Sequence, residues 1–137
     1  MVQALLEAVG PEGTLLMPSF NHQAADVFNP LATPTTNGAI PDAFWRRRGV
    51  VRSLHPTHAV AAFGPHAEAW CAHHLEVGIW AAQSPIGRLI HGGGSILGLG
   101  VDHTSSTAYH VAEVSMQVPC LDTFGDRRSL VAEDGSV

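Results

Sequence analysis

The chain has 137 residues, of which 45% are hydrophobic and 14% are charged, and its formal net charge is -5 at pH 7. This length favours one domain with its own core, and the ordinary apolar fraction excludes a disordered chain. No apolar run approaches the ~18–20 residues of a membrane span, and a negative net charge argues against sequence-independent binding of nucleic acid.

The first part of the chain has the pattern of an α/β unit. Apolar residues at one helical face predict a helix over Val2 to Val9, the Gly- and Pro-containing residues 10–13 end it, and Thr14 to Met17 follow as a short buried strand. Residues 18–41 hold four prolines among many polar residues. We expect a long loop there, and loops of this length inside a domain are usually functional.

The remaining elements are shorter and are separated by Gly and Pro. We predict a helix from Ile40 to Arg48, strands at 50–53 and 59–63 around a His-Pro turn, a helix at 66–74 and a helical turn at 86–90. A glycine-rich turn then leads into a predicted apolar strand at 95–100 and a helix from about 106 to 116. The first residues lack the pattern of a signal peptide, so we expect a cytoplasmic protein in which Cys71 and Cys120 are free thiols.

The residues from 98 to 113 contain the strongest candidate for catalysis. An apolar strand, a Ser- and Thr-rich loop and a helix follow one another, which is where α/β proteins often place ligands. Thr107, His110 and Glu113 are spaced i, i+3 and i+6 and so lie near one helix face. A histidine beside a carboxylate is a good general base, and a threonine hydroxyl can donate to an oxyanion. The same spacing also fits an ordinary helix capped by Ser105 or Ser106, with the histidine and the glutamate merely paired.

A second candidate stretch, residues 52–64, places a cation and hydrogen-bond donors around a turn. Arg52 and Ser53 precede His55-Pro56, and His58 follows. Spacing alone favours an ordinary turn with an interior histidine. The nine histidines raise the question of a metal, and His110-x-x-Glu113 resembles the Glu/His pairs of carboxylate-bridged metal sites. Because no HExxH, HxH or CxxC pattern is present, we predict no metal site.

These stretches together resemble the aminoglycoside 3-N-acetyltransferase family. The matching segments are GTLLMPSF at 13–20, the stretch 38–64 with its RSLHPTH core, SPIGRL at 84–89 and SILGLGVDHTSSTAYHVAE at 95–113. The resemblance implies the α/β sandwich of that family, truncated here at both termini. It also implies transfer of an acetyl group from acetyl-CoA to the 3-amino position of an aminoglycoside antibiotic, which confers resistance, with no metal.

The resemblance assigns roles by position. His110 is similar to the family's general base, Glu113 to its acidic partner that helps hold the amine, and Thr107 to the hydroxyl that stabilises the oxyanion. Arg52, Ser53 and His55 are similar to the segment that lines the arm of CoA. The negative net charge suits a polycationic substrate.

The sequence also departs from the family pattern. Ala59 stands where Ser is common, Asp42 where Glu is common and Ser106 where Asn is common, and family members are much longer. We therefore expect residues 1–137 to be a single partial domain, with a homodimer as one outcome of apolar faces left exposed. The alternatives are a non-catalytic CoA-binding remnant, an N-acetyltransferase for a non-aminoglycoside amine, and a metal-dependent hydrolase built on the histidines.

Overall fold

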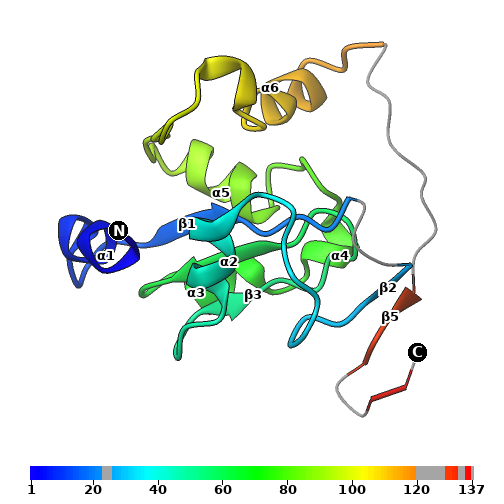
Figure 1. Cartoon of the computed structure of the whole chain (residues 1–137). Coiled ribbons are helices and arrows are strands. Elements are labelled where there is room, and N and C mark those ends of the chain that lie inside the picture. The colour runs from blue at the N-terminus through cyan, green and yellow to red at the C-terminus, as the bar shows by residue number, and fades with distance from the viewer. Residues whose placement is uncertain (23–25, 120–128, 133–134, 137) are drawn as a thin grey trace.

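The computed structural model describes residues 1–22, 26–119, 129–132 and 135–136 (Figure 1). In chain order the elements are α1 (Val2–Val9), β1 (Leu15–Pro18), β2 (Val27–Phe28), α2 (Ala39–Trp45), β3 (Val51–Arg52), β4 (Val60–Phe63), α3 (Ala67–Cys71), α4 (His74–Val77), α5 (Pro85–His91), the 3-10 helix η1 (His103–Ser105), α6 (Tyr109–Ser115) and β5 (Ser129–Leu130). None of the helices in these described ranges is long and apolar enough to cross a membrane.

A three-stranded antiparallel sheet with the order β1-β4-β3 forms the centre of the fold. Leu15 of β1 lies opposite Phe63 of β4, and Val51 of β3 lies opposite Ala62. Three consecutive residues of the central strand, 60–62, are almost completely buried. Because successive side chains of a strand point to opposite faces, this burial means that both faces of the sheet are covered.

Helices pack on the two faces of this sheet and complete its core. On one face Met17 and Ala61 pack against Phe44 and Trp45 of α2, and apolar residues of α1 extend the cluster. On the other face Ala62 packs against the residues of α3. The mixed α/β architecture expected from the sequence is therefore confirmed, and the predicted helix at 2–9 is present with the predicted bounds.

The long loop after β1 contains a short strand that the sequence did not predict. β2 pairs in parallel with β5, so Val27 lies opposite Ser129 and Phe28 opposite Leu130. A two-residue strand has too few residues to produce an alternating pattern, and its partner lies about a hundred residues later, so only long-range pairing defines it.

Arg52 fixes the same loop to the sheet. Its guanidinium donates to three backbone carbonyls, those of Thr33 at 2.6 Å, Pro30 at 3.2 Å and Ser19 at 3.2 Å. The guanidinium carbon also lies 4.9 Å from the ring centre of Phe28 and 4.3 Å from that of Trp45. Burial lowers the pKa of Arg52 to about 10, so the side chain stays charged at neutral pH.

Two predicted helices end earlier than the sequence suggested. The helix expected at 66–74 is divided into α3 and α4 because His73 adopts a left-handed backbone conformation with φ 60°, which interrupts the right-handed helix. The helix expected to reach Arg48 ends at Trp45, whose indole Nε1 donates to Asp42 at 2.9 Å. The local backbone conformation at Ala72 and His73 therefore ends the first of these helices, and a side-chain hydrogen bond within the last turn accompanies the end of the second.

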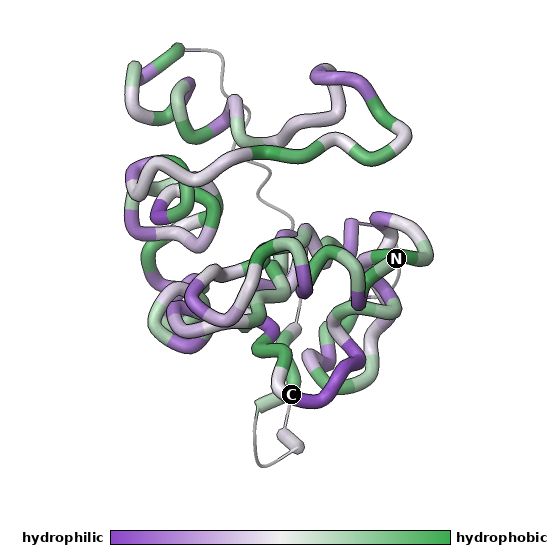
Figure 2. The backbone as a smooth tube through the Cα atoms, turned by 90° about the vertical axis from the view of Figure 1, so that its left-hand side faces the viewer, coloured by the Kyte–Doolittle hydropathy of each residue, from purple (hydrophilic) through white to green (hydrophobic). Residues whose placement is uncertain are grey.

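The strand predicted at 95–100 is wrong. These residues are not in a strand, and Ile96, Leu97 and Leu99 are 56%, 68% and 43% exposed. The tube coloured by hydropathy shows apolar segments along this connection between α5 and α6, above the layer of the sheet (Figure 2). An apolar sequence forms a strand only beside a neighbour that satisfies its backbone, and no described strand pairs with this segment.

The helix predicted from Ser106 begins three residues later, at Tyr109. Asp102 caps the preceding 3-10 turn by accepting a hydrogen bond from the backbone N–H of Thr104 at 3.0 Å, so the polar loop forms a tight turn of its own before α6.

Candidate active site

The candidate site lies where four parts of the chain meet at one end of the sheet. Residues 19–21 continue past β1 along the β3–β4 turn. The backbone N–H of Ser19 donates to the carbonyl of Ala59 at 2.8 Å, and that of Asn21 donates to the carbonyl of Thr57 at 2.9 Å. The loop after α4 contributes Trp80, and α6 contributes His110. In the fold α6 lies beyond α5 when viewed from the sheet (Figure 1).

His110 and Glu113 form a close pair on α6. Nδ1 of His110 lies 2.6 Å from Oε2 of Glu113, and the two side chains are 45% and 43% exposed. A carboxylate accepts hydrogen bonds only, so it selects the tautomer in which Nδ1 carries the hydrogen. The other ring nitrogen, Nε2, then has the lone pair that a general base needs. The pairing predicted from the i, i+3 spacing is confirmed.

Thr107 lies one turn before this pair. Its backbone carbonyl accepts the N–H of His110 at 3.2 Å, and the residue is half-buried. Because α6 begins only at Tyr109, Thr107 belongs to the segment that leads into the helix rather than to the helix itself. The backbone of Thr107 is therefore close to that of His110, and the role of the hydroxyl toward an oxyanion stays a prediction.

Ser53 is directed into the protein. Its hydroxyl accepts the backbone N–H of Val60 at 2.8 Å and is hydrogen-bonded to Nδ1 of His74, also at 2.8 Å. Ser53 and His74 are each 1% exposed, and burial lowers the pKa of His74 to about 4. Arg52 donates to three backbone carbonyls. Arg52 and Ser53 therefore both hold the β3–β4 turn in place.

The two histidines of the turn are hydrogen-bonded and uncharged. Nδ1 of His55 accepts the backbone N–H of His58 at 3.1 Å, so the hydrogen of the neutral His55 ring is on Nε2. Nδ1 of His58 lies 2.8 Å from the hydroxyl of Thr57, and its Nε2 lies 2.8 Å from Nε2 of His22. Burial lowers the pKa of His55 to about 4 and, with nearby histidines adding a smaller effect, that of His58 to about 3.

Trp80 and His22 belong to the site although the sequence gave no reason to select them. The ring centre of Trp80 lies 5.2 Å from that of His58 and 5.0 Å from that of His110, and His22 stacks on Phe20 with ring centres 5.2 Å apart. Neither residue belongs to a local motif or a periodic apolar face, so only the tertiary structure identifies them.

No group of three or more His, Cys, Asp or Glu side chains within the described ranges is arranged to hold a metal ion. Cys71 is a free, buried thiol, while Cys120 lies outside the residues that the structure describes.

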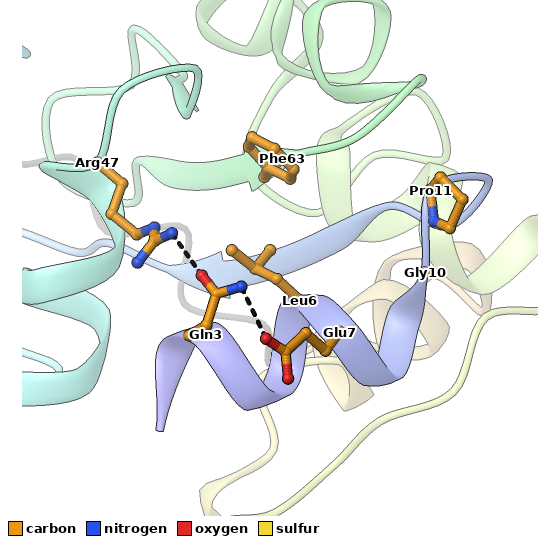
Figure 3. A pocket seen from close by; sticks show the side chains of 7 residues that line it. All are labelled: Gln3, Leu6, Glu7, Gly10, Pro11, Arg47 and Phe63. Atoms are coloured by element: carbon orange, nitrogen blue, oxygen red, sulfur yellow. Dashed lines mark hydrogen bonds between the residues drawn. The ribbon is translucent and has the colours of Figure 1, made fainter.

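A surface depression of about 410 Å³ lies elsewhere, between α1 and the sheet (Figure 3). Its lining residues come from α1, the turn after it, the segment that follows α2, and β4: Gln3, Leu6, Glu7, Gly10, Pro11, Arg47 and Phe63. Gln3 crosses it, donating to Glu7 at 3.0 Å and accepting from Arg47 at 2.9 Å. The depression contains none of the residues selected above, and we assign it no part in catalysis.

Comparison with known proteins points to one family. The sequence profile described as aminoglycoside 3-N-acetyltransferase matches residues 1–137. Among curated proteins, aminoglycoside N(3)-acetyltransferase IV from Salmonella sp is 37% identical over 140 residues, which covers 100% of this chain and 52% of that protein.

Solved structures agree with the sequence comparison. The crystal structure of the apoenzyme of aminoglycoside acetyltransferase AAC(3)-IVa has a TM-score of 0.79 and 40% identity, covering 86% of this chain and 47% of that one. The structure of AAC-IIIb in a binary complex with CoASH has a TM-score of 0.73 and 28% identity, covering 82% of this chain and 50% of that one. The chain thus spans about half the length of the relatives it matches.

Proposed function

The chain belongs to the aminoglycoside 3-N-acetyltransferase family, and from this membership and the geometry of α6 we propose that it transfers an acetyl group from acetyl-CoA to an amino group of an aminoglycoside. The observation that carries the proposal is the pair formed by Nδ1 of His110 and the carboxylate of Glu113 at 2.6 Å. Both side chains are accessible to a substrate from solvent, as a general base at the surface of a site has to be.

The proposed reaction is a direct transfer within a complex of the chain with both substrates. The lone pair of the neutral acceptor amine attacks the thioester carbonyl, and Nε2 of His110 takes one N–H proton from this amine as the bond forms. The N–C bond forms, the C–S bond breaks, and the proton taken from the amine can pass to the departing thiolate. Glu113 holds the imidazole in its tautomer and faces the positive charge while the ring carries the proton.

We propose that Thr107, with nearby backbone N–H groups, stabilises the oxyanion of the tetrahedral intermediate. The β3–β4 turn is the proposed lining of the CoA arm. In this arrangement Arg52 and Ser53 fix the backbone of the turn from the protein side, as their internal hydrogen bonds indicate, and His55 offers the Nε2–H of its neutral ring.

We also propose a cellular location and an oligomeric state for the chain. Acetyl-CoA is a cytoplasmic metabolite, so the cytoplasm is the proposed location. The exposed apolar residues of the connection between α5 and α6 favour self-association, so a homodimer is proposed and light scattering would measure it. A monomer across the micromolar range would refute the dimer.

The proposal is tested by release of CoA thiol with a panel of acceptors. The parent chain should release thiol with acetyl-CoA and aminoglycosides such as gentamicin or sisomicin, His110→Ala should lose at least a hundredfold in rate, and its circular dichroism should match that of the parent. Turnover of simple arylamines but not aminoglycosides would favour the other acceptor class. Calorimetric binding of acetyl-CoA without turnover of any amine would favour a CoA-binding module and refute the proposed activity.

A further inference from the structure

Trp80 lies between the two halves of the candidate site. Its ring centre is 5.0 Å from that of His110 on α6, with an angle of 42° between the rings. It also lies 5.2 Å from the ring centre of His58 and 6.2 Å from that of Phe20, both nearly perpendicular to it. The indole therefore connects the helix that carries the proposed base to the end of the sheet.

Few side chains of α6, the helix that carries His110, are buried. Val111 is the only buried residue of α6, whereas Tyr109 is 55% exposed and Val114 is 39% exposed. A helix with so little buried apolar surface is not held rigidly by packing alone. The contact between the rings of Trp80 and His110 therefore adds to the burial of Val111 in holding this helix and its histidine in place.

The loop that presents Trp80 is itself fixed. Ser84 is fully buried, donates its backbone N–H to the carbonyl of Ala81 at 2.9 Å, and caps α5 by accepting the N–H of Gly87 at 3.1 Å. The loop crosses α5 so closely that a Cβ on Gly87 would overlap the carbonyl of Ala81. Trp80 therefore stands just before a segment that has little freedom to shift.

We propose that Trp80 is a positioning residue for the general base, an inference that rests on the proposed function. Glu113 holds His110 through Nδ1 at the edge of the imidazole, and the indole of Trp80 packs against the ring itself. Together the two contacts restrict both side-chain torsions of the histidine and hold Nε2 toward the acceptor amine. The π-system of an indole also stabilises a cation beside it, so the contact strengthens when the imidazole takes the proton.

The kinetic test compares Trp80→Leu, which removes the ring, with Trp80→Phe, which keeps an aromatic ring. Trp80→Leu should lower kcat by about five- to tenfold, as expected for loss of one ring contact, while the KM values for acetyl-CoA and the aminoglycoside stay within about twofold. Trp80→Phe should recover most of kcat. Trp70 stacks on His66 with ring centres 5.2 Å apart, outside the site, so Trp70→Leu is the matched control and should leave kcat unchanged.

A fluorescence titration tests the contact without relying on activity. A protonated imidazole quenches an indole beside it, so part of the emission of the parent chain should change with pH and this part should disappear in His110→Gln and in Trp80→Phe. It should persist in His66→Gln, which removes only the partner of Trp70.

The outcomes separate this inference from the proposed function. An unchanged kcat in Trp80→Leu, or a pH-dependent emission as large in His110→Gln as in the parent chain, would overturn the role of Trp80. If Trp80→Leu does not fold, the titration of His110→Gln decides, because that variant keeps the indole. A parent chain without acetyl transfer would refute the proposed function, while quenching that depends on His110 would still support the contact of Trp80 with it.

Discussion

Replacing Ser53 by alanine should destabilise the fold rather than weaken binding of acetyl-CoA. The hydroxyl has two partners, the N–H of Val60 and Nδ1 of His74, each at 2.8 Å and each buried. Alanine leaves both groups without a partner and admits no water to replace it. A buried polar group left unsatisfied costs about 1–3 kcal/mol, so the two together should lower the free energy of unfolding by about 2–6 kcal/mol.

Thermal unfolding followed by circular dichroism measures this loss. For a chain of this size each kcal/mol shifts Tm by about 3–4 °C, so Ser53→Ala should unfold about 6–24 °C below the parent. Ser95→Ala makes the same chemical change at an exposed position and should leave Tm unchanged. The reasoning is refuted if Ser53→Ala unfolds with the parent and instead raises the KM for acetyl-CoA, because the hydroxyl would then be a ligand of CoA.

Three further changes test other parts of the fold. Gly87→Ala should lower the free energy of unfolding by about 1–3 kcal/mol, because its Cβ would overlap the preceding loop, and a parental urea midpoint would contradict that close approach. The pKa values of His55, His58 and His74 are lowered to about 4, 3 and 4, so the unfolded chain binds more protons between pH 6.5 and those values. The free energy of unfolding should therefore fall progressively as the pH is lowered below 6.5, and it should fall less steeply in His58→Gln. Equal urea midpoints at pH 7.5 and pH 5 would disprove this. Burial raises the pKa of Cys71 to about 12, so in a Cys120→Ser background the native protein should not react with Ellman's reagent until urea unfolds it, and rapid labelling of the native protein would count against the buried thiol.

The parts of the site that the sequence predicted are those defined by neighbours along the chain. His110 and Glu113 are three residues apart, and any α-helix brings the side chains of such residues together, whatever it packs against. The same reasoning located the β3–β4 turn, because His-Pro between two apolar segments is a local signal. Neither inference required knowledge of which elements pack against each other.

The predictions that failed, and the residues that were missed, depend on partners far along the chain. Residues 95–100 have the composition of a strand, but a strand exists only where another supplies its hydrogen bonds. Trp80 meets His58 and His110 only because a loop is fixed against α5. The direction of the Ser53 side chain is likewise set by the pairing of the turn with Val60, which the motif alone does not encode.

Burial divides the histidines of the site into two kinds and thereby indicates where a proton can rest. His58 and His74 are 5% and 1% exposed, their pKa values are lowered mainly by burial, and no carboxylate of the described residues is hydrogen-bonded to either. A positive charge on these rings would lack both water and a counter-ion, so His58 and His74 are uncharged in the folded protein. His110 has both solvent access and the carboxylate of Glu113. Of the three rings compared, His58, His74 and His110, it is therefore His110 on α6 that is equipped to accept a proton from a substrate.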